Sequence, residues 1–444
     1  MRRSQAAAAV ALVVALLAPL AATAATTATA APRAPVPKAA DVGISDTEIH
    51  LAVIADVENS IVPGLFKSGV DAMRAWAKIV NRQGGIARRR VVIDFIDSKL
   101  NPNESRNATI TACSQDFAMV GSEALFLTNV DDMVGCKDAQ GNPTGLPDMA
   151  GLALDVNQRC SPVTYIASGD TAFCPTRNDH PQTYHAQQGD ARFYLKKDKD
   201  LHGIFTLPSD LKATRNSEIV PFQAAVNLGI KKDGQGFYDV SASSQQSALT
   251  PIVQVIKSNN STFVYNGSSF GIMVLLRREA TLQGVNTVRI WACNQGCYDS
   301  AFLKQGGADV EGTYSILTTL PFLTEYKSNP TLKALVKELG GPANLNANAV
   351  GALTGALLFQ DAAEKAVANG GTLTRKSLLD AVKTEHRFDA KGIIGPTDVG
   401  DHQPPGCIVM TQVKNGQWVR VSPAKPGTFD CNKQNIVLLK MDLS

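Results

Sequence analysis

The sequence predicts an α/β protein with two similar lobes, each built on a parallel, Rossmann-like β-sheet flanked by helices. The chain has 444 residues, more than a single core of the commonest size holds, so we expect two domains. Residues 51–97 show the pattern of an apolar strand, a helix and a second apolar strand. From residue 187 a similar alternation starts again, which indicates a second lobe of the same architecture.

The opening strand–helix–strand stretch organises the first lobe. Residues 51–55 form an apolar run of strand length, and apolar side chains over residues 70–80 then recur at the helical period. Gly84 and Gly85 end this helix, and residues 91–96 form the next strand. We expect the two strands to be parallel, and ligands of such sheets bind beyond the carboxyl ends of the strands.

The remaining chain continues these patterns. Further strands are expected at residues 117–121, 149–154, 163–167, 202–207, 236–240, 262–265 and 288–292, with helices between them. Late helices are expected at residues 344–369 and 375–384, the second with Thr374 as its N-cap. Apolar runs on both sides of Asn415-Gly416 indicate a β-hairpin near the end of the chain.

The charge distribution argues against a nucleic-acid partner. The formal net charge is +3, and the basic residues are scattered along the chain. The run Arg88-Arg89-Arg90 is short and lacks interleaved aromatic residues, so we interpret it as a solvated edge.

The N-terminus indicates export. Arg2 and Arg3 precede an apolar run at residues 6–20, and Ala22-Thr23-Ala24 has the small-x-small pattern of a cleavage site. We therefore predict a signal peptide at residues 1–24, followed by a disordered Ala/Thr/Pro-rich leader at residues 25–41. A membrane anchor is the weaker alternative, since the run falls short of a span of about 20 residues. No Cys follows the run directly, so the lipoprotein form is not expected.

Eight cysteines in an exported chain predict disulfide bonds. Sequence alone leaves the connectivity open. The simplest proposal pairs neighbours: Cys113 with Cys136, Cys160 with Cys174, Cys293 with Cys297, and Cys407 with Cys431. A zinc site is disfavoured, because no tight CxxC pair and no nearby His accompany these cysteines.

Several short motifs occur in the order found in one known family. They are residues 42–49 before the first strand, Gly69, Asn81, Gly84, Gly85, Ile86 and Arg88 on the first helix and its exit, Asp97 and Ser98, and later Phe388, Gly392, Gly395, Asp401 and residues 415–418. From about residue 42 to residue 423 the chain resembles the type I periplasmic binding proteins, in particular the branched-chain amino-acid (Leu/Ile/Val-like) solute-binding proteins of ABC importers.

The resemblance implies two lobes joined by a hinge that the chain crosses three times. Lobe 1 would comprise residues 42–175 plus 322–385, and lobe 2 residues 176–321 plus 386–444. A small-molecule ligand would bind between them, and closure around it would form the state that an ABC permease in the membrane recognises. A monomer without cofactors is expected.

The loops after the strands supply the candidate ligand-binding residues. They are Glu58, Asn59, Ser60, Ser122 and Glu123 in the first lobe, and Ser209, Asp210, Asn266, Gly267 and Asn294 in the second. Ser, Asp and Asn also occur at such positions as turn or cap residues, because their side chains bond to nearby backbone groups.

Glu123 makes the ligand class uncertain at the level of sequence. Family members that bind a free amino acid hold its carboxylate with hydroxyl and main-chain N–H groups after strand three, and Ser122 fits this role. If Glu123 and Glu58 face the same space, they repel an anionic ligand, so a cationic, hydroxylated or amide ligand is equally compatible. The alternative is that Glu123 caps its own helix and points to water.

The leading functional hypothesis is a non-enzymatic, exported solute-binding protein that captures a small polar or amino-acid-like metabolite for import. An alternative is a ligand-sensing module that acts on a membrane receptor. An exported enzyme is a remote alternative, because no nucleophile and base can be assembled from the six histidines. No metal site is expected, since His180 and His185 have no carboxylate motif beside them.

Overall fold

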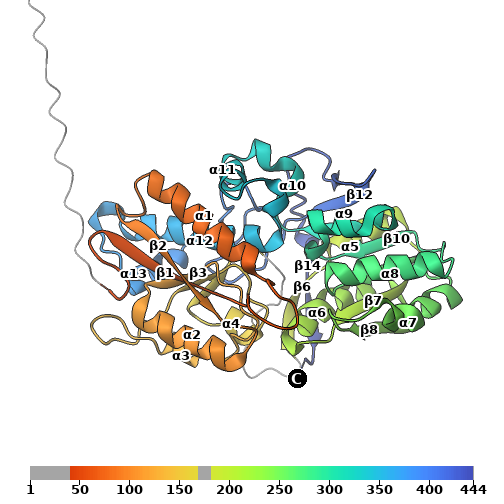
Figure 1. The fold of residues 1–444 in the computed structure, drawn as a ribbon, viewed down its shortest axis with the longest axis horizontal. Coiled ribbons are helices and arrows are strands. Elements are labelled where there is room, and N and C mark those ends of the chain that lie inside the picture. Colours follow the sequence, from red (N-terminus) through yellow and green to blue (C-terminus); the bar gives the residue numbers. More distant parts are fainter. Residues whose placement is uncertain (1–40, 169–181, 444) are drawn as a thin grey trace, which may run out of the picture. The chain divides into compact units, whose positions relative to one another are not determined.

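Five parallel strands form the first sheet, as the opening stretch predicts. The computed structural model describes residues 41–168 and 182–443 (Figure 1), so the predicted signal peptide and nearly all of the predicted leader lie outside it. The strand order is β2-β1-β3-β4-β5. The bounds are β1 Glu48–Ala55, β2 Arg90–Asp97, β3 Ala118–Val120, β4 Asp148–Ala150 and β5 Thr164–Ile166.

Helix α1, Lys67–Arg82, connects β1 to β2 and packs against both strands. Its buried face includes Val70, Met73 and Val80, at the spacing that the apolar pattern predicts. The helix ends at Gly84 and Gly85, whose φ angles of 106° and 76° lie in the left-handed region that glycine adopts readily. The predicted parallel strand–helix–strand unit is therefore confirmed.

The second sheet has seven strands in the order β13-β12-β11-β10-β9-β7-β8. The bounds are β7 His202–Pro208, β8 Lys231–Val240, β9 Phe263–Asn266, β10 Ile290–Cys293, β11 Tyr314–Leu317, β12 Val409–Lys414 and β13 Gln417–Ser422. Strands β7 to β11 run parallel to one another. Strand β12 pairs antiparallel with both β11 and β13. Strand β11 was not predicted.

The predicted hairpin is confirmed. Asn415 and Gly416 connect β12 to β13 and have φ angles of 52° and 68°. Two positive φ angles in succession are what a two-residue hairpin turn with the twist of the flanking strands needs, and Asn-Gly is the favoured pair.

A third, two-stranded sheet joins distant parts of the chain. Strand β6, Gln182–Gln187, pairs antiparallel with β14, Ile436–Met441. Neither strand was predicted. The second alternation, expected from residue 187, begins after β6 with α5, Gly189–Lys197.

Most of the remaining helices follow the predicted order with shifted bounds, whereas those at residues 156–159, 300–306 and 322–325 were not predicted. The remaining helices are α2 Pro102–Gln115, α3 Asp131–Val134, α4 Val156–Arg159, α6 Lys212–Leu228, α7 Gln246–Ser258, α8 Phe270–Leu282, α9 Ser300–Gly306, α10 Phe322–Glu325, α11 Pro330–Glu338, α12 Ala347–Ala366 and α13 Arg375–Val382. Thr374 is the N-cap of α13, as predicted, because its Oγ1 accepts a hydrogen bond from the Ser377 N–H at 3.0 Å. Within the described residues, no helix combines the length and the apolar character that a membrane span needs.

Helix α12 lies against α1 and the first sheet, although it comes late in the chain (Figure 1). Most of its side chains are buried, and small residues allow the close approach. A Cβ on Gly355 would lie 2.4 Å from the Met149 carbonyl oxygen, and one on Gly151 would lie 2.9 Å from the Ala352 Cα. Glycine is therefore required on both sides of this contact.

Three of the four predicted disulfides are present. They join Cys113 to Cys136, Cys293 to Cys297, and Cys407 to Cys431. Cys174, the predicted partner of Cys160, lies outside the described residues.

We expect Gly355→Ala to lower the free energy of unfolding by about 1–3 kcal/mol, because the added methyl group overpacks the contact between α12 and β4. Chemical denaturation measures this change. Gly271→Ala is the matched control: it lies in helix α8, and a Cβ there would meet only the Ser269 Oγ, at 3.7 Å. Equal stabilities of the two variants would contradict the packing argument.

Candidate functional site

A cavity of about 430 Å³ lies where the carboxyl ends of the two sheets meet. The loops after β1, β3 and β4 line it from the first sheet, and the segments after β7, β9 and β10 line it from the second. The start of α12 supplies Asn346, Ala347 and Asn348. This position is where open parallel sheets bind ligands.

The two walls of the cavity differ in chemistry. The first sheet contributes the apolar side chains of Val62, Leu65, Phe66, Leu125, Leu152 and Leu154. The second contributes mainly hydroxyl, amide and carboxyl groups, from Thr214, Ser217, Glu218, Ser268, Ser269, Asn294 and Gln295. The described lining residues include the acids Glu218 and Asp299 but no Lys or Arg. The cavity therefore suits a molecule with an apolar part and a neutral or cationic polar part.

Hydrogen bonds hold the polar wall in place. The Asn294 Nδ2 donates to the Glu218 Oε1 at 2.7 Å and to the Gly267 carbonyl at 3.1 Å. The Asn294 Oδ1 accepts from the Gly296 N–H at 3.0 Å. Asn294 thereby ties α6 to the loops after β9 and β10, and an oriented group costs less entropy when it binds a ligand.

A second hydrogen-bonded pair lies behind this wall. Asp190 and Tyr265 line a small space of about 30 Å³ together with Glu218 and Asn294. The Tyr265 hydroxyl donates to the Asp190 Oδ2 at 2.6 Å, and burial raises the pKa of this tyrosine well above its ordinary value. The hydroxyl therefore keeps its proton and acts as a donor.

Two of the ten predicted ligand-binding residues, Gly267 and Asn294, line the 430 Å³ cavity. Two others stabilise the framework next to it. The Ser122 Oγ accepts a hydrogen bond from the Ile54 N–H at 3.1 Å. Asn266 accepts from the Thr206 hydroxyl at 2.8 Å and donates to the carbonyls of Ser268 and Ser269.

Five predicted residues do not line the cavity. Glu58, Ser60, Ser209 and Asp210 are exposed. The Asn59 Oδ1 accepts from the N–H groups of Ile61 and Val62, so this side chain caps its own turn. The Asp210 carboxylate accepts from the Ser241 hydroxyl and the Ala242 N–H, which fixes the neighbouring loop. These contacts are the turn and cap roles that the sequence left open.

Comparison with known proteins identifies the chain. The family model described as periplasmic binding protein matches residues 48–417. The chain belongs to the periplasmic binding protein family. The predicted type I periplasmic binding protein fold is confirmed. Among curated protein sequences, none matches this periplasmic binding protein significantly.

Solved structures share the fold. The fatty acid ABC transporter substrate-binding protein from Thermomonospora curvata is 17% identical, with a TM-score of 0.67 over 88% of this chain and 98% of that one. An ABC transporter substrate binding protein from Aeropyrum pernix is 17% identical, with a TM-score of 0.66 over 87% and 97%. The leucine binding protein LivK from Thermotoga maritima is 15% identical, with a TM-score of 0.61 over 84% and 98%.

The tenth candidate in this periplasmic binding protein, Glu123, lies differently from both expectations. It is 1% exposed, so the alternative that it caps a helix and points to water is wrong. It does not pair with Glu58 either, since Glu58 is exposed. Its Oε2 lies 2.1 Å from the position that a Cβ on Gly69 of α1 would take, and it lines a cavity of only about 20 Å³ beside the larger one.

Burial of the Glu123 carboxyl group favours its protonated form. Neither of its oxygens has a hydrogen-bond partner among the described residues. Burial raises the pKa of Glu123 well above its ordinary value, because the charged form loses its hydration. The raised pKa of Glu123 weakens the anionic repulsion that the sequence suggested at this position.

Several polar residues of the cavity wall were missed, and three of them lie in helix α6. Thr214, Ser217 and Glu218 share one face of α6, because they are three and four residues apart. The prediction considered only the loops directly after the strands, whereas these residues lie within the following helix. Their spacing on an otherwise apolar face of a post-strand helix is the signal that could have revealed them.

Glu123→Gln should raise the thermal midpoint more at pH 8 than at pH 5. The folded state holds the Glu123 proton to a higher pH than the unfolded state, so wild-type stability falls as pH rises above about 4.5. The amide removes this loss because it does not ionise. Scanning calorimetry across this range measures the difference.

The exposed residue Glu58 supplies the control for this pH effect. Glu58→Gln makes the same chemical change at the surface, where no burial cost is relieved, so the thermal midpoint should stay close to that of wild type. A pH-independent effect of Glu123→Gln would contradict the raised pKa of this buried carboxyl.

Proposed function

We propose that this periplasmic binding protein captures a small amphipathic metabolite, polar or amino-acid-like at one end, and presents it to the permease of an ABC importer. The observation that carries this proposal is the contrast between the apolar and polar walls of the 430 Å³ cavity. Pockets for small ligands commonly measure about 300–1,000 Å³ and combine apolar walls with a few placed polar groups. The family's solute-binding role supports capture rather than turnover.

The charge of the lining narrows the ligand class. Glu218 and Asp299 are present without a lining Lys or Arg, so an isolated carboxylate would be desolvated without a countercharge. We therefore propose a hydroxyl, amide or amine group against the polar wall and a hydrocarbon part against Leu125, Leu152 and Leu154. The names of two structural relatives, a fatty acid binder and a leucine binder, support a ligand with a hydrocarbon part.

Closure of the two lobes would complete the site. All strands of the first sheet lie within residues 48–166, and those of the second within residues 202–422. This division supports the proposed lobe 1, residues 42–175 plus 322–385, and lobe 2, residues 176–321 plus 386–444. A ligand that contacts both walls favours the closed state by those extra contacts.

Export and delivery belong to the same proposal. Members of this family are exported, and a signal peptide at residues 1–24 would direct the chain out of the cytoplasm. We propose that the mature protein acts as a monomer. Loss of this chain should abolish uptake of its ligand by the source cells at low ligand concentration.

Leu152→Trp tests the cavity directly. Leu152 lines the cavity and is half-buried, so a larger side chain should fill ligand space. Titration calorimetry with a panel of amino acids, amides, amines, alcohols and fatty acids should identify a ligand of the wild-type protein. We expect its affinity to fall at least about 10-fold in the variant, which corresponds to about 1.4 kcal/mol.

Leu282→Trp is the matched control, because Leu282 is 75% exposed and lies outside the cavity lining. It should bind like wild type. Unchanged affinity in Leu152→Trp would remove this cavity from the function. A preference for simple carboxylates over their amides would contradict the proposed charge class.

A further inference from the structure

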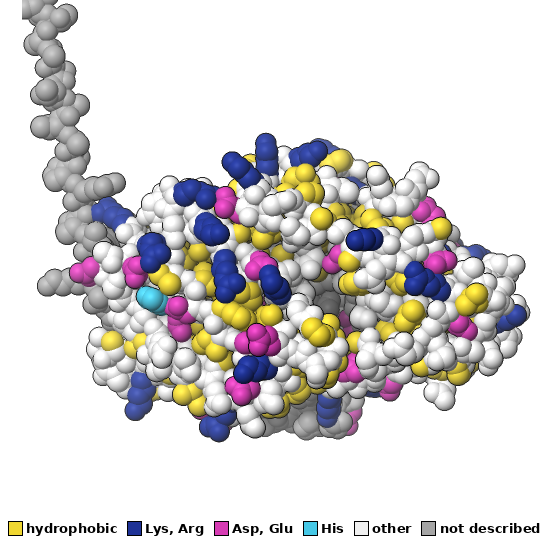
Figure 2. Space-filling view, viewed as in Figure 1, with side chains coloured by type: hydrophobic (Ala, Val, Ile, Leu, Met, Phe, Trp, Pro, Cys, Tyr) yellow, Lys and Arg dark blue, Asp and Glu magenta, His cyan; other side chains and the backbone are white. Residues whose placement is uncertain are grey.

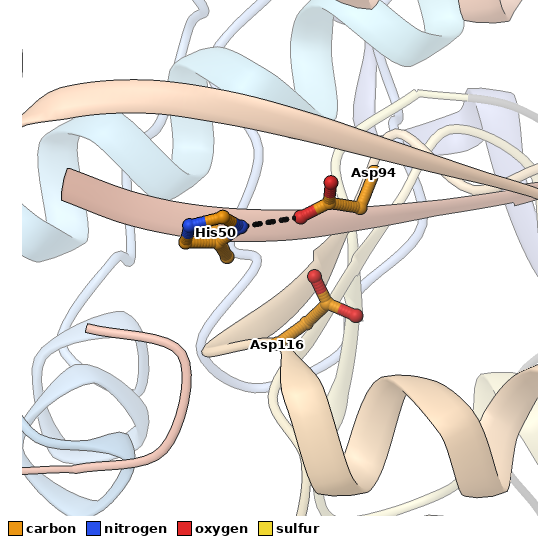
Figure 3. Close-up of side chains that lie close together, drawn as sticks. All are labelled: His50, Asp94 and Asp116. Atoms are coloured by element: carbon orange, nitrogen blue, oxygen red, sulfur yellow. Dashed lines mark hydrogen bonds and ion pairs between the residues drawn. The ribbon is translucent and has the colours of Figure 1, made fainter. Parts of the chain in front are cut away.

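Three ligand-type side chains meet in the first sheet, far from one another in sequence. His50 lies in β1, Asp94 in β2, and Asp116 two residues before β3, and these three strands are neighbours in the sheet (Figure 3). One nitrogen or oxygen from each lies within 4.8 Å of the other two. His50 and Asp94 share a face of the sheet, because Asp94 pairs with Ala52, two residues after His50.

The cluster of three side chains is buried on the side of Asp116 and exposed to solvent on the side of His50 and Asp94. Asp116 is 1% exposed, and its Oδ1 has no hydrogen-bond partner among the described residues. Its carboxyl group is directed toward Asp94 (Figure 3). The side chains of His50 and Asp94 are 38% and 41% exposed, so an ion could reach the group from solvent. A buried carboxyl oxygen without a partner is costly unless a cation or donor compensates it.

The nearest buried cation does not serve this purpose. The Arg375 guanidinium donates to the main-chain carbonyls of Asp116, Phe117, Cys113 and Lys137. Its hydrogen bonds thus go to backbone oxygens and to the Cys136 Sγ, and none of them reaches the Asp116 carboxyl group. On the outer side, Glu48 lies 3.6 Å from the His50 Nε2 and forms an ion pair with Arg90.

We infer that His50, Asp94 and Asp116 form a binding site for a divalent transition-metal ion of the zinc type. An imidazole nitrogen with two carboxylate oxygens is a ligand set that Zn²⁺ accepts, and two carboxylates balance its charge. Bonds of about 2.0–2.2 Å place any two ligand atoms within about 4.4 Å of each other, so a small inward shift suffices.

The ion would replace the direct contact between His50 and Asp94. The His50 Nδ1 and the Asp94 Oδ2 are now 2.7 Å apart, and both atoms would turn to the metal. The His50 Nε2–H would then face Glu48, the kind of outer-shell carboxylate that orients a metal-bound imidazole. Water would complete the coordination on the exposed side.

This site would be structural and separate from the ligand cavity. His50 is the third residue of β1, whereas the cavity lies beyond the carboxyl end of that strand. The ion would tie β1 and β2 to the entry of β3. We therefore expect metal binding to raise thermal stability without being required for solute capture.

A second group in the described chain provides a contrast. His386, Asp398 and Asp401 also lie within 4.8 Å of one another, but His386 and Asp401 are exposed, and none of the three is a buried residue without a partner. His202 provides a further control, because it pairs with Asp233 at 2.8 Å and belongs to no such three-residue group.

Zn²⁺ titration of the chelator-treated, tag-free protein tests the inference. We expect one ion to bind with a dissociation constant in the micromolar range or below and to raise the thermal midpoint. His50→Ala and Asp116→Asn should each weaken binding at least 10-fold. Co²⁺ should give visible absorption in the wild type that both variants lose.

The controls separate this site from other zinc binding. His202→Ala and His386→Ala should bind like wild type, and Asp116→Asn without metal should be at least as stable as wild type, which excludes misfolding. Absence of saturable Zn²⁺ binding at 100 micromolar would overturn the inference. Binding that is lost in His386→Ala but retained in Asp116→Asn would overturn it as well.

Discussion

The close packing of helix α12 on the first sheet is the contact on which the arrangement depends. The helix is buried over most of its surface, and it approaches the backbone of β4 at Gly355 so closely that a methyl group would not fit. This contact brings a segment from the last quarter of the chain onto a sheet made by the first. It also places Asn346 and Asn348, at the start of the helix, at the edge of the ligand cavity. The packing of α12 on the first sheet therefore also determines where these two asparagines lie at the cavity.

Both cavity walls follow the carboxyl ends of parallel strands, but their side chains differ in chemistry. Loops after the first-sheet strands present leucines, whereas the segments after the second-sheet strands present amides and hydroxyls oriented by Asn294. A ligand that contacts only the polar wall would leave the hydrocarbon of the other wall exposed to solvent. A ligand that contacts only the apolar wall would leave polar groups desolvated without hydrogen-bond partners. Selectivity would then arise from both walls acting together.

Much of the fold could be predicted from the sequence, because apolar runs and turn residues signal their own structure. The opening unit, the Asn415-Gly416 hairpin and three cysteine pairs are local patterns of this kind. Strands β11 and β14 escaped prediction because they are short or partly exposed and depend on distant partners.

The ligand-binding residues were harder to predict than the fold. Polar residues after strands were expected to face a ligand, but Asn59 bonds to its own loop and Asp210 to the neighbouring one. Glu218 contributes from within a helix.

The disulfide between Cys293 and Cys297 spans the residues that present Asn294 and Gln295 to the cavity. In the cytosol, where thiols stay reduced, nothing covalent would close this short loop. The polar wall would then reach its final rigidity only after the chain meets an oxidising compartment. A newly made molecule would thus hold its polar wall less firmly than an oxidised one.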